Sequence, residues 1–241
     1  MATQPVAQVA MKSGMTAALG IAKCTEYGGK LMEGFNQADY RWITEATEEH
    51  PAGIDQTGAC FTLCLLWAKR EAQQGHLGSG ITFLQRAKVR PKMRTHISNM
   101  QKILITTDFQ QQHRDRMLRE ANLARTGPET RIAWFASYVF NSQYPTHEDK
   151  ITAYRSAVAD AICGDFNGYR QISMSFPQAP GHAVAARYFG KEFVFFDPNG
   201  GVAEFPDRGS FRDWFLKLYI PRTSYEEATI FRINNFVPSA S

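Results

Sequence analysis

Three residues that lie far apart in the sequence are of the types that together perform nucleophilic acyl transfer: Cys60, His182 and Asp197. In such a set a thiolate attacks a carbonyl carbon, an imidazole moves the proton, and a carboxylate holds the imidazole in one orientation. The chemistry requires the three side chains to meet, so the elements that carry them must bring one helix and two strands together.

Cys60 stands at the start of a predicted helix. Residues 60–74 (CFTLCLLWAKREAQQ) are apolar for two turns and amphipathic afterwards, with glycines just before and just after the stretch; this pattern is typical of a buried helix. Backbone N–H groups and the helix dipole at a helix N-terminus stabilise a thiolate. The position therefore favours Cys60 as a nucleophile, whereas Cys64, one turn later on the apolar helix, is expected to pack in the core.

His182 and Asp197 lie on two strands that we expect to form a hairpin. Residues 182–189 (HAVAARYF) and 192–197 (EFVFFD) are rich in β-branched and aromatic residues, and Gly190–Lys191 between them suits a two-residue turn. This turn sets a register in which the residue two beyond His182 lies opposite Asp197. Because alternate side chains share a face, Asp197 becomes the diagonal neighbour of His182, roughly 7–8 Å away between backbone positions.

The motifs GACFTLCLLW, GHAVAARY and FFDPNGG, in this order, resemble those of papain-like cysteine proteases of the YopT/AvrPphB type, which bacteria deliver into host cells. The resemblance covers residues 53–240, and its specificity lies in the three motifs. It implies a papain-like fold, a catalytic triad of Cys60, His182 and Asp197, and endopeptidase activity on a host protein.

The tetrahedral intermediate of this chemistry also needs hydrogen-bond donors for its oxyanion. The backbone N–H of Cys60 is one candidate, and an upstream side chain is the other. Gln56 is chemically suited, because an ionised Asp55 has no proton to donate. In the proteases of the resemblance, however, the oxyanion side chain commonly lies five or six residues before the cysteine, where this sequence has Asp55 and Ile54.

The order of the predicted elements indicates an α+β fold, since helices come first and strands follow. With the resemblance, we expect a central N-terminal helix that carries the nucleophile and packs on an antiparallel sheet with flanking helices. We expect residues 1–50 to form a mobile or partly ordered leader and residues 51–241 the protease domain. The further predicted helices are 81–89, 110–125, 148–163 and 210–220, the last with a capping box formed by Ser210 and Asp213, and the further strands are 171–176 and 228–236.

Charge is distributed unevenly along the chain. The formal net charge is +4, yet residues 86–107 contain six Lys or Arg residues and no acidic residue. The basic 86–102 segment suits an acidic partner or an anionic membrane surface, and the alternative is an ordinary solvated face on a helix and loop. It lacks a nucleic-acid-binding motif, so we expect no nucleic acid as a partner. The histidines lack ligand-like spacing and no phosphate-binding loop is present, so we expect no metal and no cofactor.

Targeting signals are sparse. No run approaches the 18 apolar residues of a membrane span, and the N-terminal stretch lacks the apolar region of a Sec signal. The four cysteines do not have the density of a disulfide framework. Together with the resemblance, this predicts secretion by a non-Sec route and action in the host-cell cytoplasm.

Two other functions fit the same residues. A glutamine deamidase or another acyl-transfer enzyme uses the same triad and also passes through a thioester. A non-enzymatic binding module would instead act through the basic 86–102 segment.

Overall fold

The structure is a computed structural model that describes residues 17–37, 59–74, 79–87, 110–134, 143–177 and 181–239. Within these residues, seven antiparallel strands form one sheet in the order β1-β6-β5-β4-β3-β7-β2. Their bounds are β1 Lys30–Gly34, β2 Leu123–Ala133, β3 Gly168–Ser175, β4 His182–Phe189, β5 Glu192–Asp197, β6 Gly201–Phe205 and β7 Ile230–Pro238.

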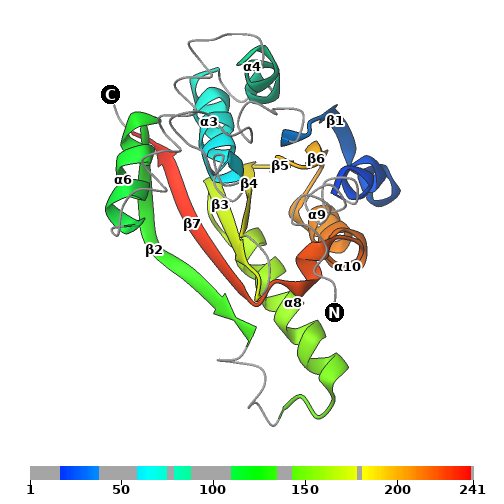
Figure 1. Ribbon diagram of the computed structural model, residues 1–241. Helices are drawn as coiled ribbons and strands as arrows, with labels where there is room; N and C mark the ends of the chain where they lie inside the picture. Colours follow the sequence, from blue (N-terminus) through cyan, green and yellow to red (C-terminus); the bar gives the residue numbers. More distant parts are fainter. Residues whose placement is uncertain are drawn as a thin grey trace, which may run out of the picture.

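Helices lie on both faces of this sheet (Figure 1). One face carries α3 (Ala59–Gln73), α4 (Ser79–Ala87) and α6 (Gln110–Glu120). The other face carries η1 (Lys23–Tyr27), α8 (His147–Cys163), α9 (Arg208–Trp214), η3 (Phe215–Tyr219), α10 (Ile220–Arg222) and η4 (Ser224–Glu227). The expected α+β arrangement, with the Cys60 helix on an antiparallel sheet, is confirmed.

Helix α3 is buried over most of its length. Its first ten residues are nearly all apolar, and those from position 62 to 68 are buried on every side, which is what a helix apolar around its whole circumference requires. Trp67 stacks on Phe196 of β5 with ring centroids 5.5 Å apart. The Cys64 thiol donates to the carbonyl oxygen of Ala183 at 3.4 Å. These contacts fix the first turns of α3 beside the start of β4.

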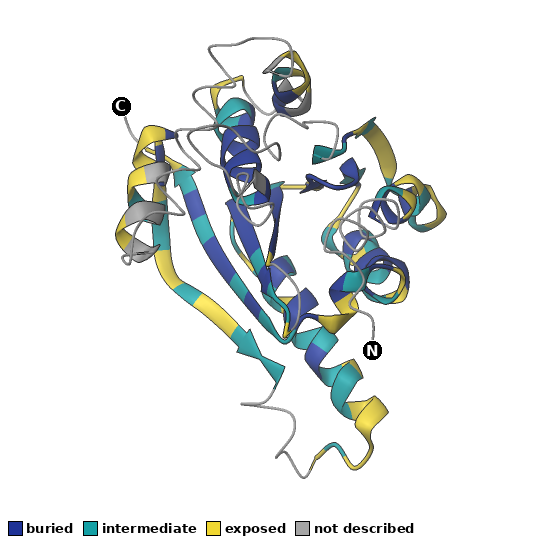
Figure 2. Ribbon diagram, in the orientation of Figure 1, coloured by how far each residue is buried: buried dark blue, intermediate teal, exposed yellow. Residues whose placement is uncertain are grey.

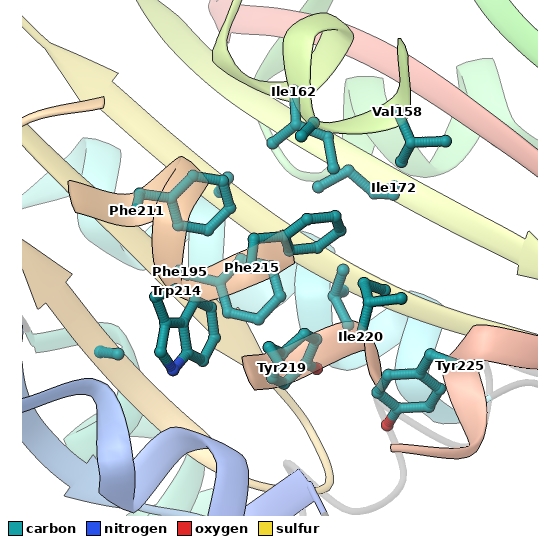
Figure 3. Packing of buried hydrophobic residues seen from close by; sticks show 14 of the residues in the cluster. Val158, Ile162, Ile172, Phe195, Phe211, Trp214, Phe215, Tyr219, Ile220 and Tyr225 are labelled. Atoms are coloured by element: carbon teal, nitrogen blue, oxygen red, sulfur yellow. The ribbon is translucent and has the colours of Figure 1, made fainter. Parts of the chain in front are cut away.

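The opposite face of the sheet is covered by an aromatic cluster (Figure 3). Phe211 lies 4.0 Å, centroid to centroid, from Phe193, and Trp214 lies 4.6 Å from Tyr219. Phe195 of β5 also packs edge-on against Tyr219, with centroids 5.2 Å apart. Because these rings are buried together, α9 and η3 are held against β5, and Tyr219 is held near the end of that strand.

Residues 17–37, part of the predicted leader, pack into this same fold. Ala17, Ile21 and Cys24 are fully buried in the core that contains the aromatic cluster. Strand β1 pairs with β6. Gly201 has φ +119°, and a Cβ there would collide with the carbonyl oxygen of Glu33, so only glycine lets the two strands approach. The boundary expected at residue 50 lies outside the described residues and stays a prediction.

Strand β2 differs from the sequence expectation. The sequence predicts a helical stretch over 110–125, which is wrong at its end, because α6 ends at Glu120 and β2 begins at Leu123. β2 is an edge strand with several exposed residues (Figure 2), and its register shifts between Thr126 and Thr130. It therefore lacks the apolar alternation that identifies a strand from sequence.

The helix predicted over 210–220 begins earlier than expected. The carboxylate of Asp207 accepts a hydrogen bond from the backbone N–H of Ser210 at 2.8 Å, so Asp207, not Ser210, is the N-cap residue. The helical path also continues through Pro221. A π-helical turn, η3, precedes α10, and Pro221 lies in the first turn of α10, where its missing N–H is not needed.

Candidate active site

Cys60 is the second residue of α3 and is 1% exposed. Helix α3 has 15 residues, and the N–H groups and dipole at the N-terminus of a helix favour a negative charge placed there. The apolar run that buries α3 is therefore also what positions the thiol at the end of the sheet, next to the start of β4.

The β4–β5 hairpin brings His182 and Asp197 together. The observed pairs include Tyr188 with Phe193, which is the predicted register, and Gly190 occupies the turn with φ +78°. The Nε2 atom of His182 lies 2.9 Å from Oδ1 of Asp197. The expectation that these two residues are diagonal neighbours on one face is confirmed.

His182 also interacts with Cys60. Burial lowers the pKa of His182, but the charges of Asp197 and Cys60 and the hydrogen bonds to both side chains raise it by more, to about 10. Because Nε2 faces Asp197, Nδ1 is the ring nitrogen that remains for the thiol. The imidazole thus lies between a sulfur and a carboxylate, an arrangement that can hold a thiolate–imidazolium pair and transfer a proton.

Asp197 is fully buried, and its carboxylate accepts four hydrogen bonds. Oδ1 accepts from His182 and from the backbone N–H of Asn199 at 2.8 Å. Oδ2 accepts from the hydroxyls of Tyr219, at 2.5 Å, and Tyr225, at 3.0 Å. Burial raises the pKa of Asp197, but the charge of His182 and these hydrogen bonds outweigh it and hold the pKa below its usual value.

The other three cysteines are in surroundings that disfavour thiolates. Burial raises the pKa of Cys24 and of Cys163 to about 11, and it raises the pKa of Cys64 well above its usual value, with the charges of Cys60 and Asp197 adding to the effect. Among the described residues, no group of three or more His, Cys, Asp or Glu side chains is arranged to hold a metal ion.

Some predicted residues lie outside the described part of the chain. The candidate oxyanion residues Gln56 and Asp55 are among them, and so is all of the basic 86–102 segment except its first two residues. Within that segment, Arg86 is exposed at the end of α4.

Four residues around Asp197 were missed from the sequence: Tyr219, Tyr225, Asn199 and Gln37. The side-chain amide of Asn199 donates to the Tyr225 hydroxyl at 3.0 Å, and that of Gln37 donates to the side-chain oxygen Oδ1 of Asn199 at 2.6 Å. No local pattern marks them, because a tyrosine after an apolar helix and an asparagine in a turn are ordinary features of any fold.

A family model described as Peptidase_C58, Yersinia/Haemophilus virulence surface antigen, matches residues 22–237. The chain belongs to this family. As a Peptidase_C58 member it is a cysteine protease, and the recognition of a YopT/AvrPphB-type protease from its motifs is confirmed.

The Peptidase_C58 domain is similar in structure to the Pseudomonas avirulence protein AvrPphB. The match has a TM-score of 0.51 and 14% sequence identity, and it covers 81% of this chain and 98% of that one. At this identity the likeness shows the fold alone, which is the expected papain-like α+β fold.

The YopT domain of the Pasteurella multocida PfhB2-toxin also aligns, with a TM-score of 0.32 and 20% identity over 85% of this chain and 92% of that one. Among curated proteins, none matches the chain. None of the described helices of the Peptidase_C58 domain combines the length and the apolar composition that a membrane span requires.

Proposed function

We propose that this Peptidase_C58 member is an endopeptidase that cleaves a host protein through a triad of Cys60, His182 and Asp197. The observation that carries the proposal is the position of His182, which interacts with Cys60 and whose Nε2 donates to Oδ1 of Asp197 at 2.9 Å. A sulfur, an imidazole and a carboxylate in this order are what thiol hydrolysis requires.

In the first step the Cys60 thiolate attacks the carbonyl carbon of the scissile peptide bond. The carbonyl oxygen becomes an oxyanion, which accepts a hydrogen bond from the backbone N–H of Cys60 and from an upstream side chain, Gln56 being the candidate. The C–N bond then breaks as the His182 imidazolium gives its Nδ1 proton to the leaving amine. The product that remains on the enzyme is a thioester at Cys60.

In the second step water attacks the thioester. Neutral His182 accepts the proton of the water molecule, the C–S bond breaks, and the acid product leaves while the thiolate–imidazolium pair is restored. Asp197 stays ionised throughout, because four donors and a low pKa favour its charged form. Its role is to hold the His182 ring and to stabilise the imidazolium.

The substrate and the site of action rest on the family. Its description as a virulence antigen, and the avirulence protein among the similar structures, support a host protein as the substrate. We propose that the chain reaches that substrate in the host-cell cytoplasm by a non-Sec route.

The test is incubation of host-cell lysate with the wild-type protein and with Cys60→Ala, followed by mass spectrometry of peptide termini. We expect new termini with the wild type and none with the variant, whose stability should stay within about 1 kcal/mol of wild type because the replaced side chain is small. A variant that still generates the termini would contradict the role of Cys60. A gain of about 1 Da at glutamine without new termini would instead indicate deamidation through the same thioester.

A further inference from the structure

We propose that Tyr225 is a positioning residue for this reaction, acting on His182 from two directions. The inference rests on the proposed function, because it concerns how the triad is held. Tyr225 lies in η4, between α10 and β7, and is 2% exposed. It is 43 positions from His182 in the sequence, and neither residue belongs to the other's strand or helix.

The first contact runs through the carboxylate. The Tyr225 hydroxyl donates to Oδ2 of Asp197 at 3.0 Å, while Oδ1 of the same carboxylate bonds Nε2 of His182 at 2.9 Å. A carboxylate that is held at both oxygens cannot rotate without losing a bond. The tyrosine therefore restrains the plane of the carboxylate that accepts the hydrogen bond of His182.

The second contact is made by the ring. The Tyr225 and His182 rings are stacked, with centroids 4.9 Å apart and an interplanar angle of 11°. This stacking restrains rotation of the imidazole about its own side-chain bonds, and a phenol face favours the positively charged imidazolium. One side chain thus restrains both the acid that orients the imidazole and the imidazole itself.

A directed chain of hydrogen bonds fixes the Tyr225 hydroxyl as a donor toward Asp197. The Asn199 amide donates to the hydroxyl oxygen at 3.0 Å, and the Gln37 amide donates to Asn199 at 2.6 Å. With its oxygen accepting from Asn199, the hydroxyl directs its proton to the carboxylate. Burial and the charge of Asp197 raise the pKa of Tyr225 well above its usual value, so the donor keeps its proton.

Tyr219 offers a useful contrast. Its hydroxyl also donates to Oδ2 of Asp197, but its ring packs in the aromatic cluster, against Phe195 and Trp214. Tyr219 therefore supports the carboxylate, whereas Tyr225 supports the carboxylate and the imidazole together.

The test is the rate at which iodoacetamide alkylates Cys60, measured across pH and assigned by peptide mapping, so that no substrate is needed. We expect Tyr225→Phe, which keeps the stacked ring, to slow alkylation near pH 6 by about threefold, the value of one hydrogen bond. We expect Tyr225→Leu, which loses both contacts, to slow it by about tenfold and to move the rise in rate to higher pH, because a less well held imidazolium stabilises the thiolate less.

Tyr154→Phe is the matched control. Tyr154 is also buried, its hydroxyl donates to the Ala228 carbonyl oxygen at 3.2 Å, and its ring packs on Phe231; neither partner is a triad residue. It should lose stability comparable to that lost by Tyr225→Phe but leave the alkylation profile unchanged. If both variants alter the profile alike, or if Tyr225→Phe is folded and has the wild-type profile, the proposal is overturned.

A double-mutant cycle separates a positioning role from a merely structural one. In an Asp197→Ala background the Tyr225 hydroxyl has lost its target, so adding Tyr225→Phe should change the alkylation rate by less than about twofold. An equal slowing in both backgrounds contradicts action through Asp197.

His182→Ala distinguishes the failure of this inference from that of the proposed function. If His182→Ala leaves alkylation unchanged, the Cys60–His182 pair itself is wrong. If His182→Ala slows alkylation and the Tyr225 variants do not, the triad stands and only the role of Tyr225 is lost.

Discussion

At the scale of single residues, the proposed active site is organised around a buried negative charge. Asp197 is fully buried, and its surroundings contribute one imidazole, two phenols and one backbone N–H as donors. Taking a carboxylate out of water is costly unless its lone pairs are satisfied. Here every donor that stabilises the carboxylate also restrains the group that orients His182, so stability and orientation have the same physical origin.

His182 should make the free energy of unfolding depend on pH. Its pKa is about 10 in the folded protein against 6.5 for the free side chain. A pKa raised on folding contributes stability that is complete below the unfolded value and is lost as pH rises toward the folded value. We therefore expect the free energy of unfolding, measured by urea denaturation, to fall between about pH 7 and pH 10 more steeply for wild type than for His182→Gln. Equal slopes for the two proteins would contradict the raised pKa.

At the scale of elements, two short turns position His182 and Asp197. The two-residue turn at Gly190 sets the register of β4 and β5. The turn after β5 then closes on Asp197, because the Gly200 N–H donates to the Asp197 carbonyl oxygen at 3.0 Å and the Asn199 N–H donates to its carboxylate. Asp197 is thus held by its own turn before any distant side chain reaches it.

The junction of β1 and β6 should depend on one glycine. Gly201→Ala forces a side chain into left-handed backbone and into contact with Glu33, and we expect it to lower the free energy of unfolding by about 1–3 kcal/mol. Gly190→Ala is the control, since Gly190 also has a positive φ but an added Cβ would meet nothing within 4 Å. Chemical denaturation should show a larger loss of unfolding free energy for Gly201→Ala than for Gly190→Ala. Equal losses would mean that the close approach of β1 to β6 does not contribute to stability.

At the scale of the whole molecule, the sheet separates two cores and the site lies where they meet. Cys60 comes from the core formed by α3, whereas Tyr219 and Tyr225 belong to the aromatic core on the other face. His182 and Asp197 stand at adjoining ends of β4 and β5 and join the two sides. The geometry of the site therefore depends on how both layers are held against the sheet.

A buried ion pair helps to hold α3 and α4 against the sheet. Glu71 of α3 accepts from the Gly80 N–H of α4 at 2.7 Å and pairs with Arg187 of β4 at 3.3 Å, with both side chains nearly inaccessible. We expect Glu71→Ala to cost about 3–5 kcal/mol, because it leaves a buried guanidinium without its counter-charge.

Asp213→Ala is the control for that ion pair. Asp213 pairs with Lys217 at 2.8 Å on an exposed helix surface, and exposed pairs contribute about 0–1 kcal/mol. Urea denaturation of both variants measures the difference. Similar small losses would show that the Glu71 pair does not hold α3 and α4 to the sheet.

The sequence by itself determined the local parts of this protein. The apolar run after Cys60 predicts a buried helix, and the spacing about Gly190–Lys191 predicts the register that brings His182 and Asp197 onto one face. Such features depend on neighbouring residues, whose periodicity and turn chemistry are visible in a single sequence. The sequence does not predict edge strand β2, because its exposed side chains leave no periodic apolar signal.

Only the tertiary structure decided what surrounds Cys60, His182 and Asp197, the proposed triad. Gln37 and Asn199 are separated by 162 positions and Tyr225 and Asp197 by 28, and no periodicity connects residues at such separations. Their contacts arise because β1 adds to β6 and because the aromatic core holds η3 and η4 against β5. Long-range packing, not local propensity, supplies these partners, and with them the second oxygen of Asp197 and the stacked face of His182.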